Sequence, residues 1–506
     1  MSATRPTEDP RARPSEPEID AFSSVDADVL HEECGVLGIV SGDLPAAPMA
    51  HLGLYALQHR GQESAGIATS DGVHMWHHRG MGLVSQVFDA DRISQLPGSL
   101  AVGHVRYSTM GSAQLANAQP IVIPSPWGML ALAHNGNLIN APQWRAALEA
   151  EGVEFTGTTD SEVIAQMIAH APAPSVEEAI AHTMRRIEGA YTIVVLVGGR
   201  VLGFRDAHAI RPLAIGTTGQ TWMIASESCA FDHLGGVPVR EVDPGELVIL
   251  DANGLQSIQV LPPLRVAQCV FEYIYFARPD TVLADRNVHV TRRRLGRILA
   301  REHPVQADVV IPVPDSGASA AMGYAEASGI PLEVGLIKNR YIGRTFIQPD
   351  PALRDFGVRV KLNPLRDVLE GRRVVLVDDS IVRGTTSGKI VRMLRASGAT
   401  EVHVRISSPP IRYSCYYGID TSSRGQLVAA TASVEEIRAL IGADSLGYLS
   451  QSGLVEALQL APDRLCMACL DGAYPTTVPV EALAGRHALE TPARRPESAL
   501  TGADDV

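Results

Sequence analysis

Residues 373–387 have the sequence RVVLVDDSIVRGTTS, and this stretch decides the fold of the second half of the chain. Its four consecutive apolar residues, three of them valine, are typical of a parallel strand that is buried on both faces. Asp378 and Asp379 follow where this strand ends, and ligands of open α/β sheets bind at that edge. The stretch therefore predicts an α/β domain with a ligand site that begins at the two aspartates.

The residues after the two aspartates suit a sugar phosphate. Arg383, Gly384, Thr385 and Thr386 supply a cation, backbone N–H groups and hydroxyls. A helix is predicted at 390–396, and the N-terminus of a helix favours anions. The two carboxylates would face the sugar hydroxyls and a Mg²⁺ ion, which prefers oxygen ligands. A strand with a polar turn is the alternative, and the glycine, the threonines and the helix start together argue against it.

The stretch resembles the phosphoribosyl pyrophosphate (PRPP) motif of the type I phosphoribosyltransferases. The resemblance implies a domain with a parallel sheet and a second ligand loop after the apolar run at 309–313. In that loop, Asp315, Ser316 and Gly317 bind the pyrophosphate. Ser316 also lies at the Mg²⁺ ion, together with the two aspartates.

By the same resemblance, residues 338–347 form a lid over PRPP. Its cations Lys338, Arg340 and Arg344 neutralise the departing pyrophosphate, and closure of the lid keeps water away from the reacting carbon. A solvated cationic loop is the alternative for three charges in ten residues. The sequence thus predicts a closing, cationic loop beside the PRPP site.

The length and charge of the chain limit its organisation and its partners. With 506 residues it is expected to form two large domains, 34–263 and 264–475, with a seam at Leu261-Pro262-Pro263. The net charge of −13 argues against nucleic-acid binding. Because the chain has neither an apolar stretch of about 18 residues nor a signal peptide, we expect a cytoplasmic protein with no membrane partner.

Both ends of the chain are expected to be disordered. Residues 1–33 hold nine Asp or Glu and three Arg, and they are rich in Pro and Ser. Residues 476–506 are rich in Ala, Pro, Arg and Glu, which is typical of a solvated tail. Neither end is expected to carry chemistry.

Five segments of the first half place chemistry-bearing residues in a defined order. They are CGVLGIV at 34–40, QHRGQESAGI at 58–67, GHVRYST at 103–109, HNGNL at 134–138 and TTDSE at 158–162. In this order they resemble the glutaminase domain of class II glutamine amidotransferases. Those domains are N-terminal-nucleophile hydrolases with a four-layer α/β/β/α sandwich. For Cys34 taken alone, a buried structural thiol is the alternative.

The resemblance implies a role for the cysteine and for two charged residues. Cys34 is the nucleophile, and its own α-amino group, with a pKa of about 8, is the base that activates the thiol. Residues 1–33 must then be removed as a propeptide. Arg106 grips the α-carboxylate of glutamine with two parallel hydrogen bonds, and Asp160 pairs with the α-ammonium.

The oxyanion hole completes the implied pocket. Asn135 and the backbone N–H of Gly136 stabilise the oxygen that becomes negative when the amide is attacked. His59, His104 and His134 are expected to be structural, because the resemblance gives the role of the base to the amino terminus. A further segment, FRDAHAIRPL at 204–213, also resembles the family, although an alanine at position 209 replaces the usual glycine.

Four cysteines lie in the second half: Cys269, Cys415, Cys466 and Cys469. Four thiolates can hold a [4Fe–4S] cluster or zinc, and ordinary buried thiols are a third alternative, since spacing does not choose among these. Cys229 belongs to the first domain and is left out of this set.

From 34 to about 475, the order of the motifs resembles the amidophosphoribosyltransferase family. The resemblance implies the first committed step of purine synthesis, in which glutamine, PRPP and water give 5-phosphoribosylamine, glutamate and pyrophosphate. Ammonia passes inside the protein from Cys34 to a Mg-PRPP site. One branch of the family carries a [4Fe–4S] cluster and a processed propeptide, which favours the cluster here. A homotetramer inhibited by purine nucleotides is also implied.

Two other functions fit parts of the sequence. A regulatory protein that binds nucleotides and has lost catalysis would have a damaged lid or missing acids, and the sequence has both features intact. A hexosamine-forming amidotransferase shares the first domain but continues into sugar-isomerase domains. The aspartates at 378 and 379 argue against that continuation.

Overall fold

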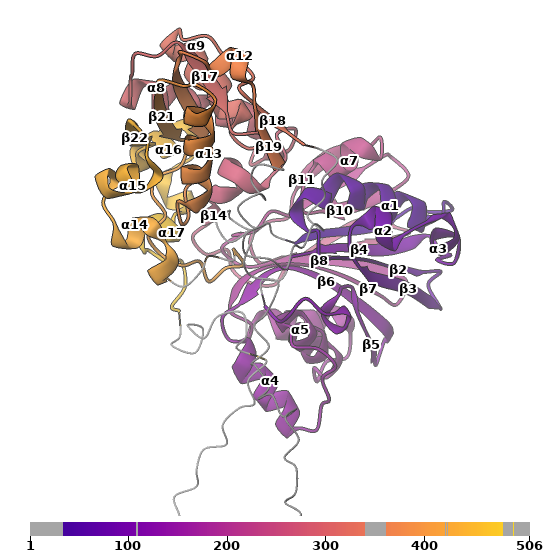
Figure 1. Ribbon diagram of the computed structural model, residues 1–506. Coiled ribbons are helices and arrows are strands. Elements are labelled where there is room, and N and C mark those ends of the chain that lie inside the picture. The colour runs from indigo at the N-terminus through magenta and orange to yellow at the C-terminus, as the bar shows by residue number, and fades with distance from the viewer. Residues whose placement is uncertain are drawn as a thin grey trace, which may run out of the picture.

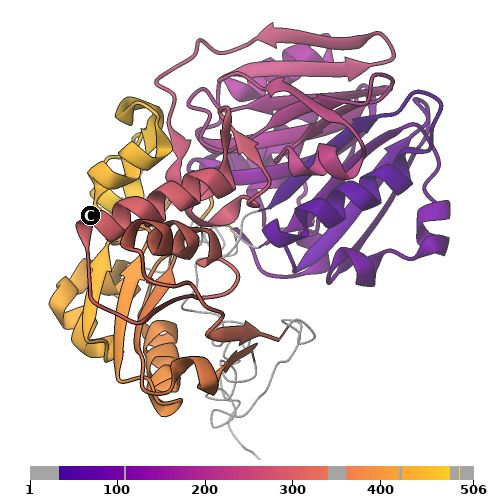
Figure 2. The same cartoon turned by 90° about the horizontal axis from the view of Figure 1, so that it is seen from above.

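The structure, a computed structural model, describes residues 34–107, 110–339, 361–419, 421, 424–478 and 489. The predictions made for 1–33, for Arg340 and Arg344, and for nearly all of 476–506 lie outside the described residues. Figure 1 shows two domains, the first coloured indigo to pink and the second pink to yellow. Figure 2 shows them side by side from above.

The first domain is built on two antiparallel sheets. Within the described residues, one sheet has the strand order β11-β9-β10-β1-β4-β2-β3 and the other β13-β12-β8-β7-β6-β5. The strands of the first sheet are β1 (Gly35–Val40), β2 (Ser64–Ser70), β3 (Met75–Met81), β4 (Leu100–Arg106), β9 (Ala214–Thr217), β10 (Trp222–Ala225) and β11 (Val237–Glu241). Those of the second are β5 (Ile121–Ser125), β6 (Gly128–Leu138), β7 (Gly189–Val197), β8 (Arg200–Arg205), β12 (Glu246–Asp251) and β13 (Gly254–Gln259).

Helices cover the outer faces of the two sheets. They are α1 (Ala46–Leu57), η1 (Gln58–Arg60), α2 (Val84–Val87), α3 (Ala90–Ser94), η2 (Leu115–Asn117), α4 (Ala141–Ala150), α5 (Asp160–Ala169), α6 (Val176–Met184) and α7 (Cys229–His233). Figure 1 shows α1 and α7 above the sheet of β1 and β4, and α5 below the sheet of β6 and β7. This is the α/β/β/α order of layers that the sequence predicted.

Strand β1 explains why its segment is apolar at nearly every position. Successive side chains of a strand point to opposite faces. Leu37 and Ile39 pack in the cluster that includes Leu54 of α1, whereas Val36 and Val40 pack in the cluster between the two sheets. Both faces of β1 are therefore buried, and the strand is held in the middle of the domain.

The second domain contains a parallel sheet with the order β17-β20-β21-β22 among the described residues. Its strands are β17 (Val309–Pro312), β20 (Arg373–Asp378), β21 (Glu401–Ile406) and β22 (Ser445–Tyr448). Its helices are α8 (Val288–Glu302), α9 (Ala318–Ser328), α12 (Arg366–Leu369), α13 (Thr385–Ala396), η4 (Arg424–Gln426), α14 (Val428–Thr431), α15 (Val434–Ile441), α16 (Gln451–Leu458), η5 (Pro462–Arg464) and α17 (Ala468–Asp471).

Strand β20 is buried on both faces, as its run of valines predicted. Val375 and Val377 pack in the cluster that includes residues of α8 and α9, and Val374 and Leu376 pack in the cluster that includes residues of α13. Burial of each of these side chains contributes about 1.5–3 kcal/mol of transfer free energy. The hydrophobic faces of the helices thus fix the strand that ends in Asp378.

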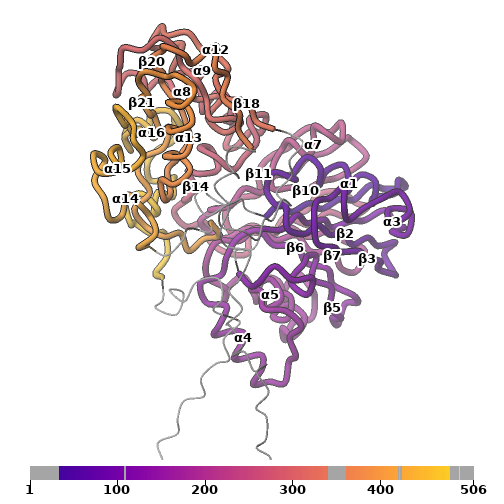
Figure 3. The backbone as a smooth tube through the Cα atoms, viewed as in Figure 1, coloured from indigo at the N-terminus to yellow at the C-terminus, as the bar shows by residue number. Residues whose placement is uncertain are grey.

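Short elements connect the two domains and finish the second one. They are β14 (Gln268–Cys269), the π-helical turn η3 (Glu272–Phe276), β15 (Val282–Leu283), β16 (Arg286–Asn287), β18 (Leu336–Lys338), β19 (Leu362–Pro364) and β23 (Leu465–Cys466). Figure 3 shows β14 on the side of the second domain that faces the first. The segment between β13 and β14 contains position 264, where the sequence predicted the second domain to begin.

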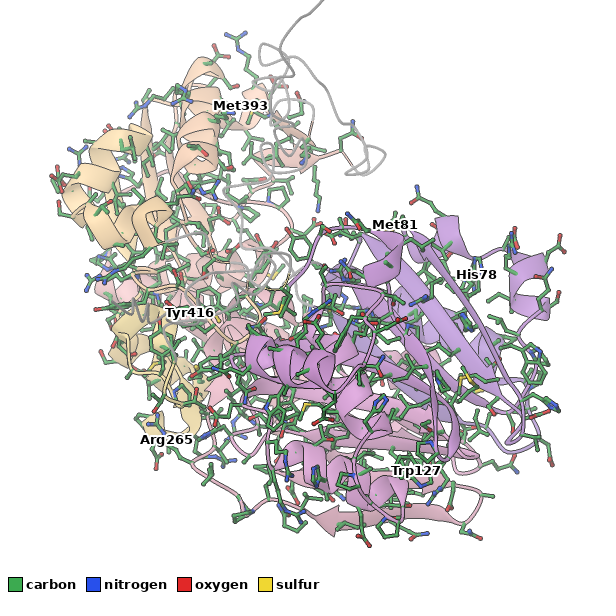
Figure 4. The ribbon with its side chains drawn as sticks, turned by 90° about the horizontal axis from the view of Figure 1, so that it is seen from below. His78, Met81, Trp127, Arg265, Met393 and Tyr416 are labelled. Carbon is green, nitrogen blue, oxygen red and sulfur yellow. The ribbon has the colours of Figure 1, made fainter. Side chains whose placement is uncertain are left out.

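Side chains of the first domain donate hydrogen bonds to backbone carbonyl oxygens of the second domain across the junction. Asn137 donates from Nδ2 to the carbonyl oxygen of Tyr416 at 3.0 Å. Arg211 donates from Nε and Nη2 to the carbonyl oxygen of Tyr417, at 2.9 and 2.6 Å. Figure 4 shows Tyr416 where the two domains meet, far from Trp127 at the other end of the first domain. The loop at 416–418 therefore docks onto the first domain.

The helices in the described part of the chain do not combine the length and hydrophobicity that crossing a lipid bilayer requires.

Ala209 stands where the resembled family usually has a glycine, and its backbone conformation is strained. Its φ angle is 52°, in the left-handed region that most L residues avoid. That conformation costs about 1–2 kcal/mol for a residue with a Cβ atom. Arg205 fixes the turn by donating to the carbonyl oxygen of Ala209 at 3.0 Å.

We expect Ala209→Gly to stabilise the protein by about 0.5–1 kcal/mol, because relief of the left-handed strain exceeds the added entropy of the unfolded chain. Urea unfolding of the two proteins measures the difference. Ala146→Gly is the control, since this exposed position inside α4 should lose about 1 kcal/mol. Equal losses in both variants would show that Ala209 is not strained.

Candidate active site

Cys34 lies at the start of β1 with its side chain in the space between the two sheets. It is on the same face of the strand as Val36 and Val40, which belong to the core between the sheets. The thiol is 5% exposed and donates to the carbonyl oxygen of Tyr107 at 3.3 Å. Burial raises the pKa of Cys34 to about 11. The thiol is therefore protonated at neutral pH, and a base must remove its proton before the sulfur can attack.

Asn135 reaches the same place from the opposite sheet. It lies on the same face of β6 as Ala133, which belongs to the core between the sheets. His104 is the partner of Val36 in the pairing of β4 with β1, and its Nε2 lies 3.0 Å from the carbonyl oxygen of His134. The residue before Asn135 is thereby held next to the start of β1, and Asn135 lies at the Cys34 end of the sandwich.

The amide of Asn135 is prepared for a ligand oxygen. Its Nδ2 is buried and has no hydrogen-bond partner within the part of the chain that the structure describes. An unpaired buried donor is costly and uncommon, so it needs a functional explanation. The next residue, Gly136, has a φ angle of 143°, and a Cβ atom there would lie 2.0 Å from the carbonyl oxygen of Ala190. Only glycine fits at this position.

Arg106 and Asp160 place opposite charges beside the cysteine. The guanidinium of Arg106 is buried and donates to the carbonyl oxygens of the loop at 110–112, at 3.1 to 3.4 Å, and it lies 3.6 Å from Glu63. Asp160 is the first residue of α5 and accepts from the N–H of Leu138 at 3.0 Å. After burial, the charges of Arg106 and Asp160 act on the pKa of the Cys34 thiol in opposite directions. The five residues predicted for the pocket are therefore brought together.

The three histidines make structural contacts, in agreement with the sequence prediction. Burial lowers the pKa of His104 to about 3, and burial also lowers the pKa of His134. His134 contacts the hydroxyl of Ser161 at 3.1 Å, and His59 contacts Glu227 at 2.8 Å. The neutral, buried imidazoles of His104 and His134 support the pocket wall, and the half-buried His59 is held by Glu227.

A second group of polar residues gathers where β17 and β20 end. Asp378 ends β20, and the Ser316 hydroxyl is within hydrogen-bonding reach of it. A Cβ atom on Gly317 would lie 2.4 Å from the carbonyl oxygen of Val377, so glycine allows the two strand ends to approach. Burial and the charge of Asp379 raise the pKa of Asp378 well above its usual value. A divalent cation would relieve this repulsion.

The anion-binding part of this second group follows the aspartates. Gly384 has a φ angle of 85° and precedes α13, which begins at Thr385. Arg383 donates to Gln426 at 2.5 Å. The helix begins at Thr385 rather than at the predicted position 390, so Thr385 and Thr386 lie in its first turn instead of in a preceding loop. The helix N-terminus and these hydroxyls follow the paired carboxylates after the short segment 380–384.

The predicted lid is described only at its start. Lys338 ends β18, and its Nζ lies 2.9 Å from Asp315. This ion pair joins the start of the predicted lid to the loop that is predicted to bind pyrophosphate. Arg340 and Arg344 lie outside the described residues.

Comparisons with known proteins identify the family of the chain. The family model of a glutamine amidotransferase domain matches residues 104–233. The amidophosphoribosyltransferase of Synechocystis sp. is 52% identical over 460 residues, which cover 90% of this chain and 93% of the relative. That of Bacillus subtilis is 49% identical over 454 residues and covers 89% of this chain and 95% of the relative. The chain belongs to the amidophosphoribosyltransferase family. It is a pentosyltransferase of purine biosynthesis with a glutamine amidotransferase domain.

Solved structures of this family share the fold over nearly their whole length. One described as the allosteric regulatory enzyme of purine biosynthesis has a TM-score of 0.86 at 47% identity, covering 90% of this chain and 99% of that one. The glutamine PRPP amidotransferase of B. subtilis, complexed with ADP and GMP, has a TM-score of 0.84 at 48% identity, with coverages of 88% and 98%. The chain thus joins an N-terminal-nucleophile hydrolase domain to a phosphoribosyltransferase domain.

The four cysteines of the second domain lie close to one another. Strands β14 and β23 pair in parallel with Cys269 opposite Cys466. Burial raises the pKa of Cys469 well above its usual value, and the charges of Cys415, Cys269 and Cys466 raise it further. Within the described residues, however, no set of three or more His, Cys, Asp or Glu side chains is arranged to hold a metal ion. The cysteines share one region of this amidophosphoribosyltransferase without forming a ligand set.

Sequence reasoning assigned no role to three buried charged residues next to the cysteine. Arg60 donates from Nε to the carbonyl oxygen of Cys34 at 3.0 Å, and from its Nη atoms to Glu227 and Glu272. All three residues are at most 2% exposed. The sequence does contain a sign of these residues, because each is a charged residue within an otherwise apolar or conformationally restricted segment. A charged residue that such a segment buries needs a partner of opposite charge.

We expect Asn135→Ala to lower kcat for glutamine hydrolysis about 10²- to 10³-fold, the usual loss for one oxyanion donor. Stability should hardly change, because the lost amide makes no hydrogen bond from Nδ2 in the described structure. Steady-state kinetics and urea unfolding measure the two effects.

Asn140→Ala is the matched control, since the amide of this buried asparagine is paired with Arg186 and Glu188 at 2.8 and 3.0 Å. It should lose about 1–2 kcal/mol of stability and keep its kcat. An Asn135→Ala protein that is destabilised but fully active would contradict the oxyanion role.

Proposed function

We propose that the chain converts glutamine, PRPP and water into 5-phosphoribosylamine, glutamate and pyrophosphate at two sites joined inside one molecule. The observation that carries the proposal is the pairing of a thiol pocket, which has an unpaired oxyanion donor, with paired carboxylates at the end of a parallel strand. Neither site alone accounts for both substrates. The cytoplasm, where purine precursors are made, is the proposed location.

In the first half-reaction, removal of residues 1–33 exposes the α-amino group of Cys34. The amine takes the thiol proton, and the sulfur attacks the amide carbon of glutamine while Asn135 and Gly136 bind the oxyanion. The proton returns to the leaving nitrogen, and ammonia departs. Water then cleaves the thioester to give glutamate and free enzyme. A thiol with a pKa of about 11 requires such an adjacent base.

Glutamine is selected by its charged ends. Arg106 binds the α-carboxylate, and Asp160 binds the α-ammonium. Both are buried, so each charge has a strong preference for a partner of the opposite sign. Together they orient the amide of the substrate toward the sulfur.

In the second half-reaction, ammonia attacks C1 of PRPP and pyrophosphate leaves. Asp378, Asp379 and Ser316 would hold Mg²⁺, which supplies charge that neutralises the leaving group. Asp315, Gly317 and residues 383–386 bind the phosphates of the substrate. Lys338, Arg340 and Arg344 belong to the lid that excludes water. Ammonia travels to this site through the interior of the protein.

A [4Fe–4S] cluster is proposed on Cys269, Cys415, Cys466 and Cys469. The donor set fits in kind, since four sulfurs lie in or against one apolar cluster near the domain junction. The cluster would cross-link segments that are far apart in sequence and supply structural rigidity. Binding to iron would also stabilise the deprotonated cysteines, whereas burial keeps free thiols protonated.

Assembly and regulation follow the relatives. We propose that purine nucleotides inhibit the activity, and binding of nucleotides is supported by a relative with 48% identity that was solved as a complex with ADP and GMP. The proposal of a homotetramer rests on the family resemblance alone. A regulatory protein without catalysis is the competing function. The activity measurements below separate the two.

We expect Cys34→Ala to lose glutamine-dependent synthesis at least about 10³-fold while synthesis from added ammonia is retained, because only the first half-reaction needs the thiol. Pyrophosphate release, with glutamine or ammonium chloride as the nitrogen source, measures both activities. The wild-type protein is first shown by intact mass and N-terminal sequencing to begin at Cys34.

Asp379→Asn is the control for that experiment, and it should lose both activities because it weakens the site that both nitrogen sources share. Fully active protein that still carries Met1 to Glu33 would overturn the role of the amine. Wild-type protein that shows neither activity would favour the regulatory alternative.

We expect anaerobically purified protein to contain about four iron and four sulfide atoms per chain, and Cys469→Ser to lose most of both together with part of its stability. Metal analysis, visible absorbance and thermal unfolding measure these quantities. Cys229→Ser, at a buried cysteine of the first domain outside the proposed glutaminase site, should keep its full iron content. Zinc in place of iron, or iron unaffected by Cys469→Ser, would contradict the cluster.

A further inference from the structure

The side chain of Arg60 connects Glu272 of the second domain to Cys34, the proposed nucleophile. Arg60 donates to its carboxylate from Nη1 at 3.0 Å and from Nη2 at 2.8 Å. The Nε–H of the same guanidinium donates to the carbonyl oxygen of Cys34 at 3.0 Å. A carboxylate that the second domain supplies is thus connected, through one arginine, to the residue that carries both the sulfur and the amine.

Glu227 forms the other side of this clamp and is itself tied to the second domain. It accepts from Nη1 of Arg60 at 2.6 Å. It also accepts from the backbone N–H of Arg278 at 2.9 Å and from the hydroxyl of Thr281 at 2.6 Å. Burial acts to raise the pKa of Glu227, but the charges of His59 and Arg60 outweigh it, so that the pKa lies well below its usual range. The group is therefore an anion at neutral pH.

The backbone that carries Glu272 is fixed independently of Arg60. Glu272 begins the π-helical turn η3, a rare conformation that is frequent at functional sites. Arg292 of α8 donates to the carbonyl oxygens of Tyr273 and Ala277, at 2.7 and 2.8 Å, and is itself buried. The turn is thus braced by a helix of the second domain. This support holds the carboxylate at a fixed position against Arg60.

Charge balance explains why the clamp needs both carboxylates. Arg211 lies 3.6 Å from Glu272, and Arg60 contacts Glu227 and Glu272. His59 also contacts Glu227 at 2.8 Å, and the charges of both carboxylates act on the buried Arg292. Without Glu272, Arg211 would lose the carboxylate at 3.6 Å and Arg60 would lose one of its two, so Arg60 would reorient to relieve the excess positive charge.

We propose that Glu272 is a positioning residue of the glutaminase site, through which the docked second domain sets the orientation of Cys34. The carboxylate holds Arg60, and Arg60 holds the Cys34 carbonyl, so the amine and the sulfur of that residue keep their alignment. This inference rests on the proposed function, and it deepens it. The glutaminase pocket is complete only when the second domain is in place.

The test uses the Glu272→Gln protein with both domains present and residues 1–33 removed. We expect kcat for glutamine hydrolysis to fall about 10- to 100-fold, because a small misalignment of a reacting group has effects of this size. KM for glutamine should change less than about twofold, since Arg106 and Asp160 bind the substrate. Synthesis from ammonia should also stay within about twofold of the wild type.

Glu246→Gln is the matched control. Glu246 is also a buried carboxylate, and it receives two hydrogen bonds from Arg240 at 2.7 and 2.6 Å, but both residues lie in the first domain. This variant should lose stability, and it should keep the wild-type kcat for glutamine. A merely structural role of Glu272 predicts the same behaviour for both variants.

A second readout does not depend on turnover. The rate at which iodoacetamide alkylates Cys34, followed by mass spectrometry as a function of pH, reports the alignment of its thiol with its amine. Glu272→Gln should change this rate at neutral pH by about threefold or more, and Glu246→Gln should leave it unchanged. Thr281→Val, a milder change that removes one hydrogen bond to Glu227, should shift the rate in the same direction by a smaller factor.

The outcomes separate the two proposals. If the wild type does not hydrolyse glutamine, the proposed function fails, and the alkylation profiles still decide the role of Glu272. If Glu272→Gln does not fold, Thr281→Val provides the test. The positioning role would be overturned if the folded variants had the alkylation rate and the kcat of the wild type. Equal losses of the glutamine-dependent and ammonia-dependent activities would overturn it as well.

Discussion

The structure depends on a cluster of buried opposite charges where the two domains meet. Arg60, Arg211 and Glu227 come from the first domain and Glu272 from the second, and all four residues are at most 2% exposed. With the domains docked but Glu272 replaced by a neutral residue, the guanidinium groups of Arg60 and Arg211 would stay buried and lose a carboxylate that both contact. Removal of one partner from a buried pair typically costs about 3–5 kcal/mol. The charge of Glu272 therefore joins the docking of the domains to the stability of the cluster.

The same junction brings the oxyanion strand against the loop that follows Cys415. Asn137, two residues after Asn135, binds the carbonyl oxygen of Tyr416. A Cβ atom on Gly418 would lie 3.1 Å from the carbonyl carbon of Gly136, so the two backbones are in close contact. The loop at 416–418 thus helps to position the backbone of the proposed oxyanion hole. If this loop is anchored by a metal cluster, the cluster acts on glutamine chemistry without taking part in it.

Local patterns predicted the elements, and long-range contacts escaped prediction. The valines of β20 indicated a strand buried on both faces, because this property depends on consecutive residues. The motif around Asn135 indicated its role through a family resemblance. The ion pair of Arg60 with Glu272 joins residues 212 positions apart, and no local pattern encodes it. The π-helical turn was not predicted either, since it depends on a hydrogen bond from Arg292. The close approach of the cysteines depends on the parallel pairing of β14 with β23, which the sequence did not indicate.

Several residues of the two sites are held in states that folding alone would not favour. The thiol of Cys34 is buried, Asn135 keeps an unpaired donor within the described structure, and the charge of Asp379 opposes ionisation of Asp378. In the proposed reaction each state would be relieved: a base for the thiol, an oxyanion for the amide, and a cation for the carboxylates. The stability that these sites lack must come from elsewhere. Strand β1, which begins at the first site, and strand β20, which ends at the second, are buried on both faces, and their packing provides this stability and fixes the reactive groups in place.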